Sequence, residues 1–307
     1  PHARAGAGIK KWEVARRRLL EFGMLQNAEP VTEPKDLHQA ILRECDRGDS
    51  RIVAVGGDGT VGQVVNTLMS LPRSMRDKLI LGAIGMGSSN DFHKPYKPSD
   101  CIVPGVPVRL CWSRPQERNV GQVDFWDTDD QWHRRYFVIN GSLGVLAAAN
   151  HFFNNPRGLL TWLKPRFLNL SIWYAGLRTV MTQPAFEGSI SENSKRLHTK
   201  ITNLSVLLSP HVSGGFSLDI PVSPTSSTFG IALCEDMTKL RRLCTFMAMA
   251  HGRFVGLPGT RAMQAAEVSV SMRRPVPLEL DGEVFMAARV HMRLLQGAIR
   301  VCSRENH

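Results

Sequence analysis

A short apolar strand that runs directly into a glycine-rich turn and then into a helix constrains this chain more than any other feature. Residues 52–55 form a continuous apolar run, which is typical of a strand covered on both faces in a parallel sheet. Apolar residues at positions 61–69 then recur at helical spacing, so a helix should begin near residue 60. The turn between the two elements consists of Gly56, Gly57, Asp58, Gly59 and Thr60.

This turn is suited to hold a phosphate group. Its glycines remove side chains where a phosphate would approach the backbone, and the N–H groups and positive dipole end of the helix face the same turn. It has neither the Gly-Lys-Ser/Thr of a Walker loop nor the G-x-G-x-x-G of a dinucleotide fingerprint. Asp58 in an anion-binding turn implies a divalent cation, a sugar or a water molecule between its carboxylate and the phosphates. A purely structural connection between strand and helix is the alternative.

A second strand that ends in a small polar turn supports the binding interpretation. Residues 78–84 resemble another buried strand and lead into Gly-Met-Gly-Ser-Ser-Asn-Asp at positions 85–91. Two such exits in succession form a crevice at the carboxyl edge of an open α/β sheet. The residues of this turn that we expect to bind are Gly87, Ser88, Ser89 and Asn90.

With these two turns, the chain resembles the diacylglycerol kinase catalytic family, which includes sphingosine and ceramide kinases and bacterial lipid kinases. It is more distantly similar to NAD kinases. In that family a strand-GGDGT-helix unit and a G-x-G-S/T-x-N-D-F segment line the ATP site. Residues 1–8 resemble the family's Asn-Pro-x-x-G-x-G opening, although its asparagine and first strand have no counterpart. The resemblance implies that Thr32 lies near the nucleotide, whereas the residues alone suit a helix cap equally well.

The resemblance extends to Leu-Glu-Leu-Asp-Gly-Glu at positions 278–283, where the family has its catalytic acidic group. It favours Glu283 as the proton acceptor, with Asp281 as the competitor, and implies that Asp58 acts through Mg²⁺ or water. An ordinary Asp-Gly hairpin turn facing solvent is the alternative.

The order of the elements predicts two domains. Residues 1–118 alternate helix and strand patterns, which indicates an α/β nucleotide-binding domain with an open sheet like that of NAD kinases and diacylglycerol kinases, lacking its first strand. In residues 119–307 strand patterns dominate, which indicates an antiparallel β-sandwich with inserted helices. The resemblance implies that this domain takes the lipid substrate. In the family the final segment can return to the first domain.

Charge and composition limit the classes of partner that the protein can bind. The net charge of +11 would attract nucleic acid, anionic lipid or nucleotide, but the basic clusters are not interleaved with aromatic residues as in a single-strand-binding groove. No stretch is long and apolar enough to span a membrane, and the six cysteines and ten histidines lack metal-ligand spacing. We therefore expect a cytoplasmic protein at an anionic membrane surface, without a nucleic-acid partner. The sequence does not determine the oligomeric state, and a homodimer is one of the alternatives.

Together these features predict an ATP- and Mg²⁺-dependent lipid kinase that phosphorylates a hydroxyl of diacylglycerol, a sphingoid base or a related lipid. The alternatives are an NAD kinase-like phosphotransferase with a soluble acceptor, and a catalytically silent nucleotide- or lipid-binding regulator. Gln63 stands where the family has a carboxylate, which makes the silent alternative conceivable. Residues 224–229 lack the adjacent aspartates that hold a structural Mg²⁺ in bacterial diacylglycerol kinases. Several large apolar residues are candidates for an acyl-chain pocket, although we favour core positions for most of them: Leu143, Val145, Leu146, Phe152, Phe153, Trp162, Phe167 and Trp173.

Overall fold

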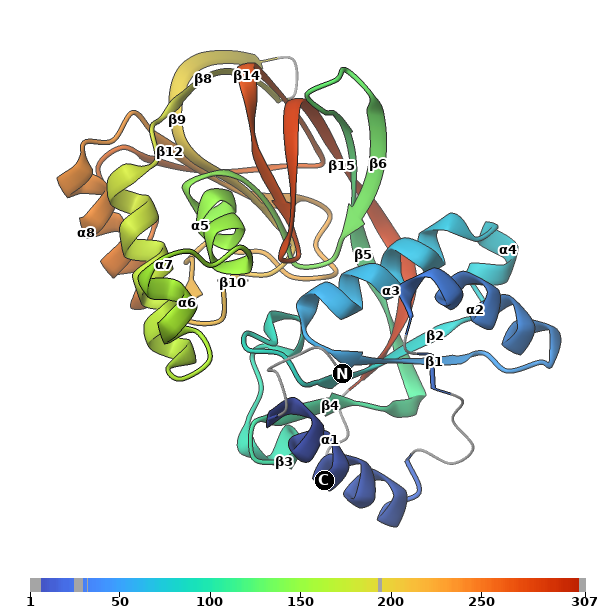
Figure 1. Ribbon diagram of the computed structural model, residues 1–307. Coiled ribbons are helices and arrows are strands. Elements are labelled where there is room, and N and C mark those ends of the chain that lie inside the picture. The colour runs from blue at the N-terminus through green and yellow to red at the C-terminus, as the bar shows by residue number, and fades with distance from the viewer. Residues whose placement is uncertain (1–6, 25–29, 32, 193–194, 304–307) are drawn as a thin grey trace. The chain divides into compact units, whose positions relative to one another are not determined.

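A computed structural model describes residues 7–24, 30–31, 33–192 and 195–303. The chain forms two compact units. Unit 1 contains Pro1–Arg118 together with Gly297–His307, and unit 2 contains Asn119–Gln296. Unit 1 therefore combines segments from both ends of the sequence (Figure 1).

Unit 1 is an α/β unit around a mixed sheet. Its helices are α1 (Ala7–Glu21), α2 (Leu37–Asp46), α3 (Asp58–Ser70) and α4 (Arg73–Arg76), with short 3-10 turns η1 (Pro34–Asp36), η2 (Asp91–His93) and η3 (Pro98–Asp100). Its strands are β1 (Arg51–Gly56), β2 (Ile80–Gly85), β3 (Cys101–Val103), β4 (Val106–Arg109), the first part of β5 (Cys111–Trp126) and the last part of β15 (Glu283–Ser303).

The sheet of unit 1 places the two glycine turns at the same edge. β1 and β2 run in parallel with Gly56 opposite Gly85, so both strands end side by side. The end of β15 also pairs in parallel with β2, at Arg300 and Val301, and β4 pairs antiparallel with it. The expected first strand of the family therefore has no counterpart in the described part of unit 1, where β1 is paired only with β2.

Helices cover both faces of this sheet, as the apolar strands require. α1 packs Ala15 and Leu19 against one face, together with Ile84 and Val108. α3 and α2 lie on the other face (Figure 1). The buried side chains of α3 recur at helical spacing, as the sequence predicts: Val61, Val64, Val65, Leu68 and Met69.

Unit 2 is dominated by antiparallel strands. They are the second part of β5, β6 (Trp132–Phe137), β7 (Asn140–Gly144), β8 (Phe186–Glu192), β9 (Lys195–Leu207), β10 (His211–Val212), β11 (Phe216–Ser217), β12 (Phe229–Glu235), β13 (Thr260–Ala265), β14 (Glu267–Leu280) and most of β15. The helices are α5 (Val145–Asn154), α6 (Leu159–Leu163), α7 (Leu168–Thr182) and α8 (Lys239–Ala250).

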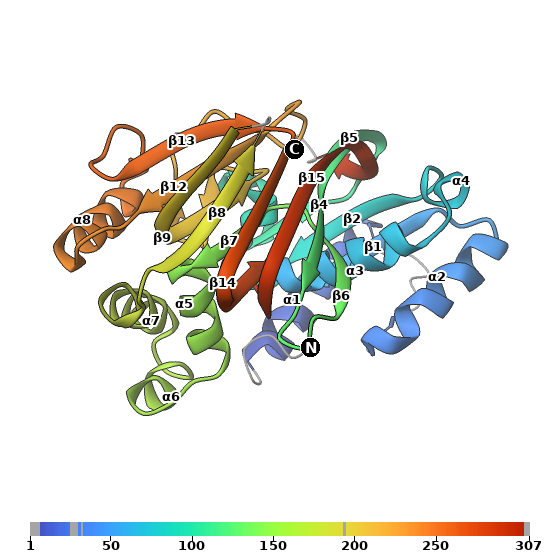
Figure 2. The same ribbon diagram turned by 90° about the horizontal axis from the view of Figure 1, so that it is seen from above.

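Four of these strands, β7, β8, β9 and β14, form a closed ring of strand pairings. β8 pairs with the first parts of β9 and β14, and β7 pairs with their later parts (Figure 2). A register shift between Ser271 and Val276 bends β14 so that one strand can serve both partners. The sequence suggests two strands here, at 267–272 and 276–280, whereas the structure has a single bent one.

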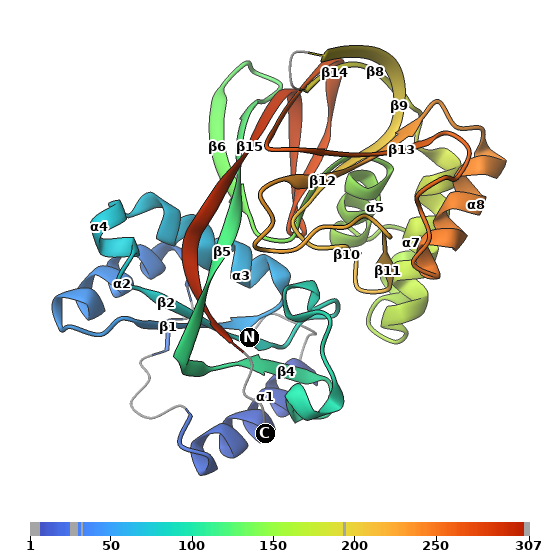
Figure 3. The same cartoon turned by 180° about the vertical axis from the view of Figure 1, so that it is seen from behind.

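Alternate residues of unit 2 strands enter two different apolar layers. In β12, Phe229, Ile231 and Leu233 belong to the layer enclosed by strands, whereas Ala232 and Cys234 face the layer beneath the helices. α5, α7 and α8 gather on that second side (Figure 3).

The predicted fold class is confirmed: an N-terminal α/β unit and a C-terminal antiparallel β-rich unit with inserted helices. The sequence pattern favours a helix at 239–251, which is α8, and a strand at 135–140, which the structure divides between β6 and β7. No helix among the described residues is long and apolar enough to cross a membrane.

Candidate active site

The two glycine turns of unit 1 touch through their backbones. A Cβ atom on Gly87 would lie 2.5 Å from the Cα of Gly57, and one on Gly57 would lie 3.0 Å from the Cα of Gly87. The Met86 N–H donates to the Gly56 carbonyl at 2.8 Å, which continues the pairing of β1 and β2 into the turns. Any side chain at Gly57 or Gly87 would therefore push the turns apart.

Gly56 has a separate steric reason to be glycine. A Cβ atom there would lie 2.2 Å from Oγ1 of Thr60, so this threonine fits only because the first turn carries no side chain at its start. Gly57 is the N-cap of α3, and no side chain caps that helix end. The helix start, with Asp58, Gly59 and Thr60, is therefore available for an anion.

Asp58 joins the two turns instead of facing outward. Its Oδ2 accepts the Asp91 N–H at 3.1 Å and its Oδ1 accepts the Phe92 N–H at 3.0 Å. Loss of solvation and the nearby charge of Asp91 raise the pKa of Asp58 to about 6, against the opposing effect of these two hydrogen bonds. Both oxygens of the carboxylate thus have a structural task that the sequence does not reveal.

Asn90 likewise stabilises the second turn. Its Oδ1 accepts the Gly87 N–H at 2.9 Å and its Nδ2 donates to the Gly85 carbonyl at 3.2 Å. The residue has a positive φ of 51°, a conformation that asparagine tolerates better than most residues. Asn90 is buried, whereas Ser88 is exposed and Ser89 is half-buried. Of the residues predicted to bind in this turn, the two serines are the more accessible.

Asp91 is a site residue that the sequence reasoning missed. Its carboxylate is 4% exposed and accepts a 2.7 Å hydrogen bond from Nζ of Lys94. The signal was present, because Asp91 directly follows Asn90 in the same kind of turn in which Asp58 was singled out. Thr32, which was also predicted to lie near the nucleotide, falls outside the described residues, as do most of the residues in the opening segment 1–8.

The Asp281–Glu283 segment lies in unit 2 and is a tight hairpin turn. Leu280 pairs with Glu283, so Asp281 and Gly282 alone form the connection between β14 and β15. Both have positive φ, 47° and 94°, as a two-residue Asp-Gly hairpin requires. The hairpin alternative considered from the sequence therefore describes the backbone correctly.

The carboxylate of Asp281 is nevertheless buried instead of facing solvent. It accepts three backbone N–H groups, from Val138 at 2.7 Å, Ile139 at 2.9 Å and Asn140 at 3.1 Å. Asp281 is 3% exposed, so it fixes the turn to the segment between β6 and β7. This arrangement gives Asp281 a structural role and leaves Glu283, which is half-buried, as the better candidate for proton transfer.

Glu279 completes the support of this turn. It accepts the Gly282 N–H and, at 2.8 Å, a hydrogen bond from Nδ2 of Asn140. The polar contacts continue inward through Ser142, whose hydroxyl lies 3.1 Å from the same Nδ2, and from there to Ser205 at 2.9 Å. Such a fully buried polar network rigidifies the backbone that carries it. Its members lie on strands that are far apart in the sequence, so no local sequence motif predicts this network.

An apolar cavity of about 40 Å³ lies in unit 2 beneath its helices. It is lined by side chains of α5, α7, α8, β9 and β12, including Val145, Leu146, Val180, Ala232 and Cys234. Burial raises the pKa of the Cys234 thiol to about 12, so the thiol stays protonated, while Arg242 also lines the cavity. Two residues from the predicted apolar set, Val145 and Leu146, do line a cavity.

The other residues of that apolar set differ in how deeply they are buried. Leu143 is fully buried in the layer enclosed by strands, as the core interpretation predicts. Trp162 and Phe167 are 51% and 52% exposed, so the core interpretation is wrong for them. Trp173 is 39% exposed but packs its ring against the buried Phe216 and Phe246, at the edge of the core. Phe152 and Phe153 are half-buried.

The residues present fit a nucleotide better than an isolated metal ion. Among the described residues, no three His, Cys, Asp or Glu side chains cluster as a metal site would require. Mg²⁺ in kinases is held by substrate phosphates and one or two carboxylates, which needs no such cluster. Asp58 and Asp91 supply carboxylates beside the uncapped start of α3.

Known proteins resemble this chain in sequence and in fold. Residues 1–103 match the family described as the diacylglycerol kinase catalytic domain. The chain is 23% identical to a Bacillus subtilis (strain 168) protein named lipid kinase YtlR over 287 residues, which cover 90% of this chain and 89% of that protein. It is 26% identical to a diacylglycerol kinase from the same strain, over 80% of this chain and 73% of that protein.

A crystal structure described as a diacylglycerol kinase from Bacillus anthracis strain Sterne has the same fold, with a TM-score of 0.64 at 16% identity. The likeness covers 89% of this chain and 84% of that chain. The resemblance predicted from the two glycine turns is thereby confirmed: residues 1–103 match the diacylglycerol kinase catalytic domain, and relatives named lipid kinase and diacylglycerol kinase align over most of the chain, which supports a lipid kinase.

Proposed function

We propose that this kinase transfers the γ-phosphoryl group of ATP to a hydroxyl of a membrane lipid, either diacylglycerol, a sphingoid base or a related lipid. The contact between Gly57 and Gly87 carries the proposal. At this contact, beside the uncapped start of α3, neither turn carries a side chain. Backbone N–H groups in such a cradle suit phosphate oxygens.

Each residue of the site then has a defined task. Ser88 and Ser89 offer accessible hydroxyls to the nucleotide, while Asp58 and Asn90 keep the two turns in place. Mg²⁺ bound with the nucleotide would neutralise the charge of the phosphates. The route from Asp58 to this ion, direct or through water, stays a prediction, since both carboxylate oxygens already accept backbone N–H groups.

Glu283 is our candidate for the group that accepts the proton of the lipid hydroxyl. Its position is fixed by the hairpin, whose geometry depends on Asp281 and Glu279. The cavity beneath α5 and α7 is our candidate for the first methylene groups of the lipid chain, because its lining is mostly apolar and its one thiol stays protonated. We further propose that the protein acts peripherally at the cytoplasmic face of an anionic membrane.

The test is transfer of radiolabelled phosphate from ATP to diacylglycerol, ceramide, sphingosine and NAD, each offered separately. Labelled lipid that disappears in Glu283→Gln supports the proposal. Labelled NAD would instead support the phosphotransferase with a soluble acceptor. Binding of ATP without labelling any acceptor would support the catalytically silent regulator.

A further inference from the structure

The helix α7 turns its large apolar side chains outward. Leu170, Trp173, Leu177 and Met181 follow one another at helical spacing and are 54%, 39%, 46% and 38% exposed. We call these four residues the α7 stripe.

Apart from Val180, the buried side of α7 is built mainly from small and polar residues. Ser171, Ala175 and Thr179 are 0%, 2% and 3% exposed. The two hydroxyls are satisfied within the helix, by the carbonyls of Phe167 and Ala175 at 2.8 Å each. Burial of apolar area inside unit 2 would favour the reverse orientation. Trp173 packs one side of its ring against Phe216 and Phe246, and the exposed remainder of the α7 stripe is left for an apolar environment outside this unit.

The neighbouring α6 segment extends this surface. Leu159, Trp162 and Phe167 are 53%, 51% and 52% exposed, and the rings of Trp162 and Phe167 lie 6.1 Å apart. α6 and α7 lie next to each other on the helical side of unit 2 (Figure 2). Contiguous exposed apolar residues of this kind mark an interaction site.

The charges around this surface identify its partner. The sequence contains no Asp or Glu between Asp130 and Glu187, whereas Arg157, Arg166 and Arg178 are exposed there. Arg166 lies over the ring of Trp162, with 5.1 Å from its guanidinium carbon to the ring centroid. Tryptophan, phenylalanine and leucine beside cations, without acidic residues, are typical of a helix in the interface of an anionic bilayer.

We infer that α6 and the α7 stripe form the surface with which this protein docks onto an anionic lipid bilayer, inserting the apolar side chains and placing the arginines at the headgroups. The inference rests on the proposed function for its purpose, because a kinase with a lipid acceptor must reach the bilayer. Binding by insertion also differs from attraction through net charge alone, since high salt should weaken it without abolishing it.

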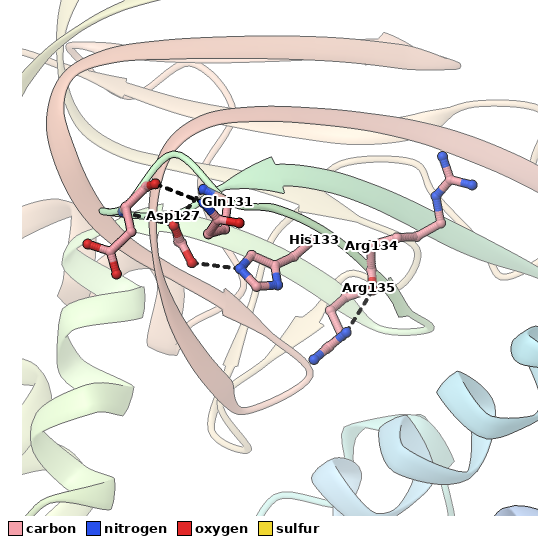
Figure 4. A network of polar contacts seen from close by, with 6 residues as sticks. Asp127, Gln131, His133, Arg134 and Arg135 are labelled. Atoms are coloured by element: carbon pink, nitrogen blue, oxygen red, sulfur yellow. Dashed lines mark hydrogen bonds and ion pairs between the residues drawn. The ribbon is translucent and has the colours of Figure 1, made fainter.

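The chain offers a closely matched control in Trp132. It is 52% exposed, and Arg134 lies 5.1 Å from its ring centroid, so both values match those of Trp162 and Arg166. Trp132, however, lies at the acidic hairpin between β5 and β6. There Asp127 accepts the Gln131 N–H at 2.9 Å and contacts Nε2 of His133 at 2.6 Å (Figure 4). Asp129 and Asp130 follow it in sequence.

The test is flotation of the full chain with vesicles of phosphatidylcholine, with and without phosphatidylserine, in the absence of ATP. We expect binding to the mixed vesicles to fall roughly tenfold in Trp162→Ser and in Leu177→Ser, as loss of one inserted apolar side chain predicts. Trp132→Ser should bind like the wild type. Circular dichroism on each variant confirms that the helices remain folded.

Unchanged binding in both Trp162→Ser and Leu177→Ser would overturn the inference, and so would complete release of the wild type by salt. Self-association of the wild type in analytical ultracentrifugation that Trp162→Ser abolishes would assign the surface to a second copy of the chain instead. Phosphorylation of detergent-dispersed diacylglycerol should be retained in Trp162→Ser. Vesicle binding through this surface without phosphorylation of any lipid would refute the proposed function and leave the inference standing.

Discussion

Gly57 and Gly87, thirty residues apart in the sequence, touch backbone to backbone where β1 and β2 end. The parallel register of the strands brings the turns together, and Asp58 holds them there through the N–H groups of Asp91 and Phe92. A cradle of this kind depends on the absence of side chains as much as on the hydrogen-bond donors that it offers.

The first prediction concerns this contact. Gly87→Ala places a Cβ 2.5 Å from the Cα of Gly57, and backbone at that distance can only move away. We expect ATP affinity to fall at least about tenfold, because a positional error of this size disrupts several phosphate contacts together. Gly215→Ala is the control, since no atom lies within 4 Å of its added Cβ. Equal ATP affinity of Gly87→Ala and the control in a calorimetric titration would contradict the proposed cradle.

The second prediction concerns the protonation of Asp58. Its pKa is raised to about 6 by loss of solvation and by the charge of Asp91, while Lys94 and the backbone N–H groups oppose this. The folded protein therefore holds the proton more tightly than the unfolded chain. Its contribution to stability is greatest below about pH 4 and is lost as the pH rises to about 6.

Asp58→Asn removes this titration. The difference in urea midpoint between wild type and Asp58→Asn should therefore change across this pH range and become constant above it. Asp46→Asn, which changes an exposed carboxylate, should keep the slope of the wild type. Parallel curves for wild type and Asp58→Asn would show that Asp58 titrates normally.

The third prediction separates the two acidic residues of the hairpin. Asp281→Asn replaces one of the two oxygens that accept three buried backbone N–H groups with an amide NH2, which leaves at least one N–H without an acceptor, so it should lower the free energy of unfolding by about 1–3 kcal/mol. Glu283→Gln should retain the melting temperature and ATP affinity but reduce turnover by about 10²–10⁴-fold, as loss of a general base does. Full turnover in Glu283→Gln would remove it as proton acceptor.

The fourth prediction concerns the cavity beneath the helices. Ala232→Val adds two methyl groups to its wall, which should raise KM for a long-chain lipid while leaving KM for ATP unchanged. Ala262 is the cross-strand partner of Ala232 but is exposed, so Ala262→Val is the matched control. If both variants keep the KM of the wild type for lipids of every chain length, the chain does not enter this cavity.

How far the sequence predicted this structure depended on whether the information was local. The strand, turn and helix around Asp58 were readable because apolar periodicity and glycine spacing act within a few residues. The task of Asp58 was not, because its partners Asp91 and Phe92 lie more than thirty residues away. For the same reason the sequence left Asp281 and Glu283 as competitors, since the N–H groups that Asp281 binds come from the distant segment between β6 and β7.

The sequence mispredicts apolar residues where either the protein's own core or an environment outside the protein could bury them. For Trp162 and Phe167 the sequence favours core or pocket, because large apolar side chains are usually buried within their own protein. In the structure they are exposed, so only a lipid bilayer or another molecule could bury them. Periodicity reports that a helix has an apolar side but does not tell which environment covers it.

The last prediction concerns the loop that replaces the magnesium site of bacterial diacylglycerol kinases. Ser223 and Ser226 close this loop locally, with the Ser223 N–H donating to Oγ of Ser226 at 2.9 Å. Asn119 fastens it from outside, since its N–H donates to the Pro224 carbonyl at 2.8 Å and its Nδ2 donates to the Ser226 carbonyl. Neutral hydroxyls cannot replace the carboxylates that Mg²⁺ prefers, so hydrogen bonds alone should order the loop. Without nucleotide, the melting temperature should be equal in Mg²⁺ and in EDTA, and Asn119→Ala should lower it by the same amount in both. A Mg²⁺-dependent increase in the wild type that Asn119→Ala abolishes would show that an ion does bind this loop.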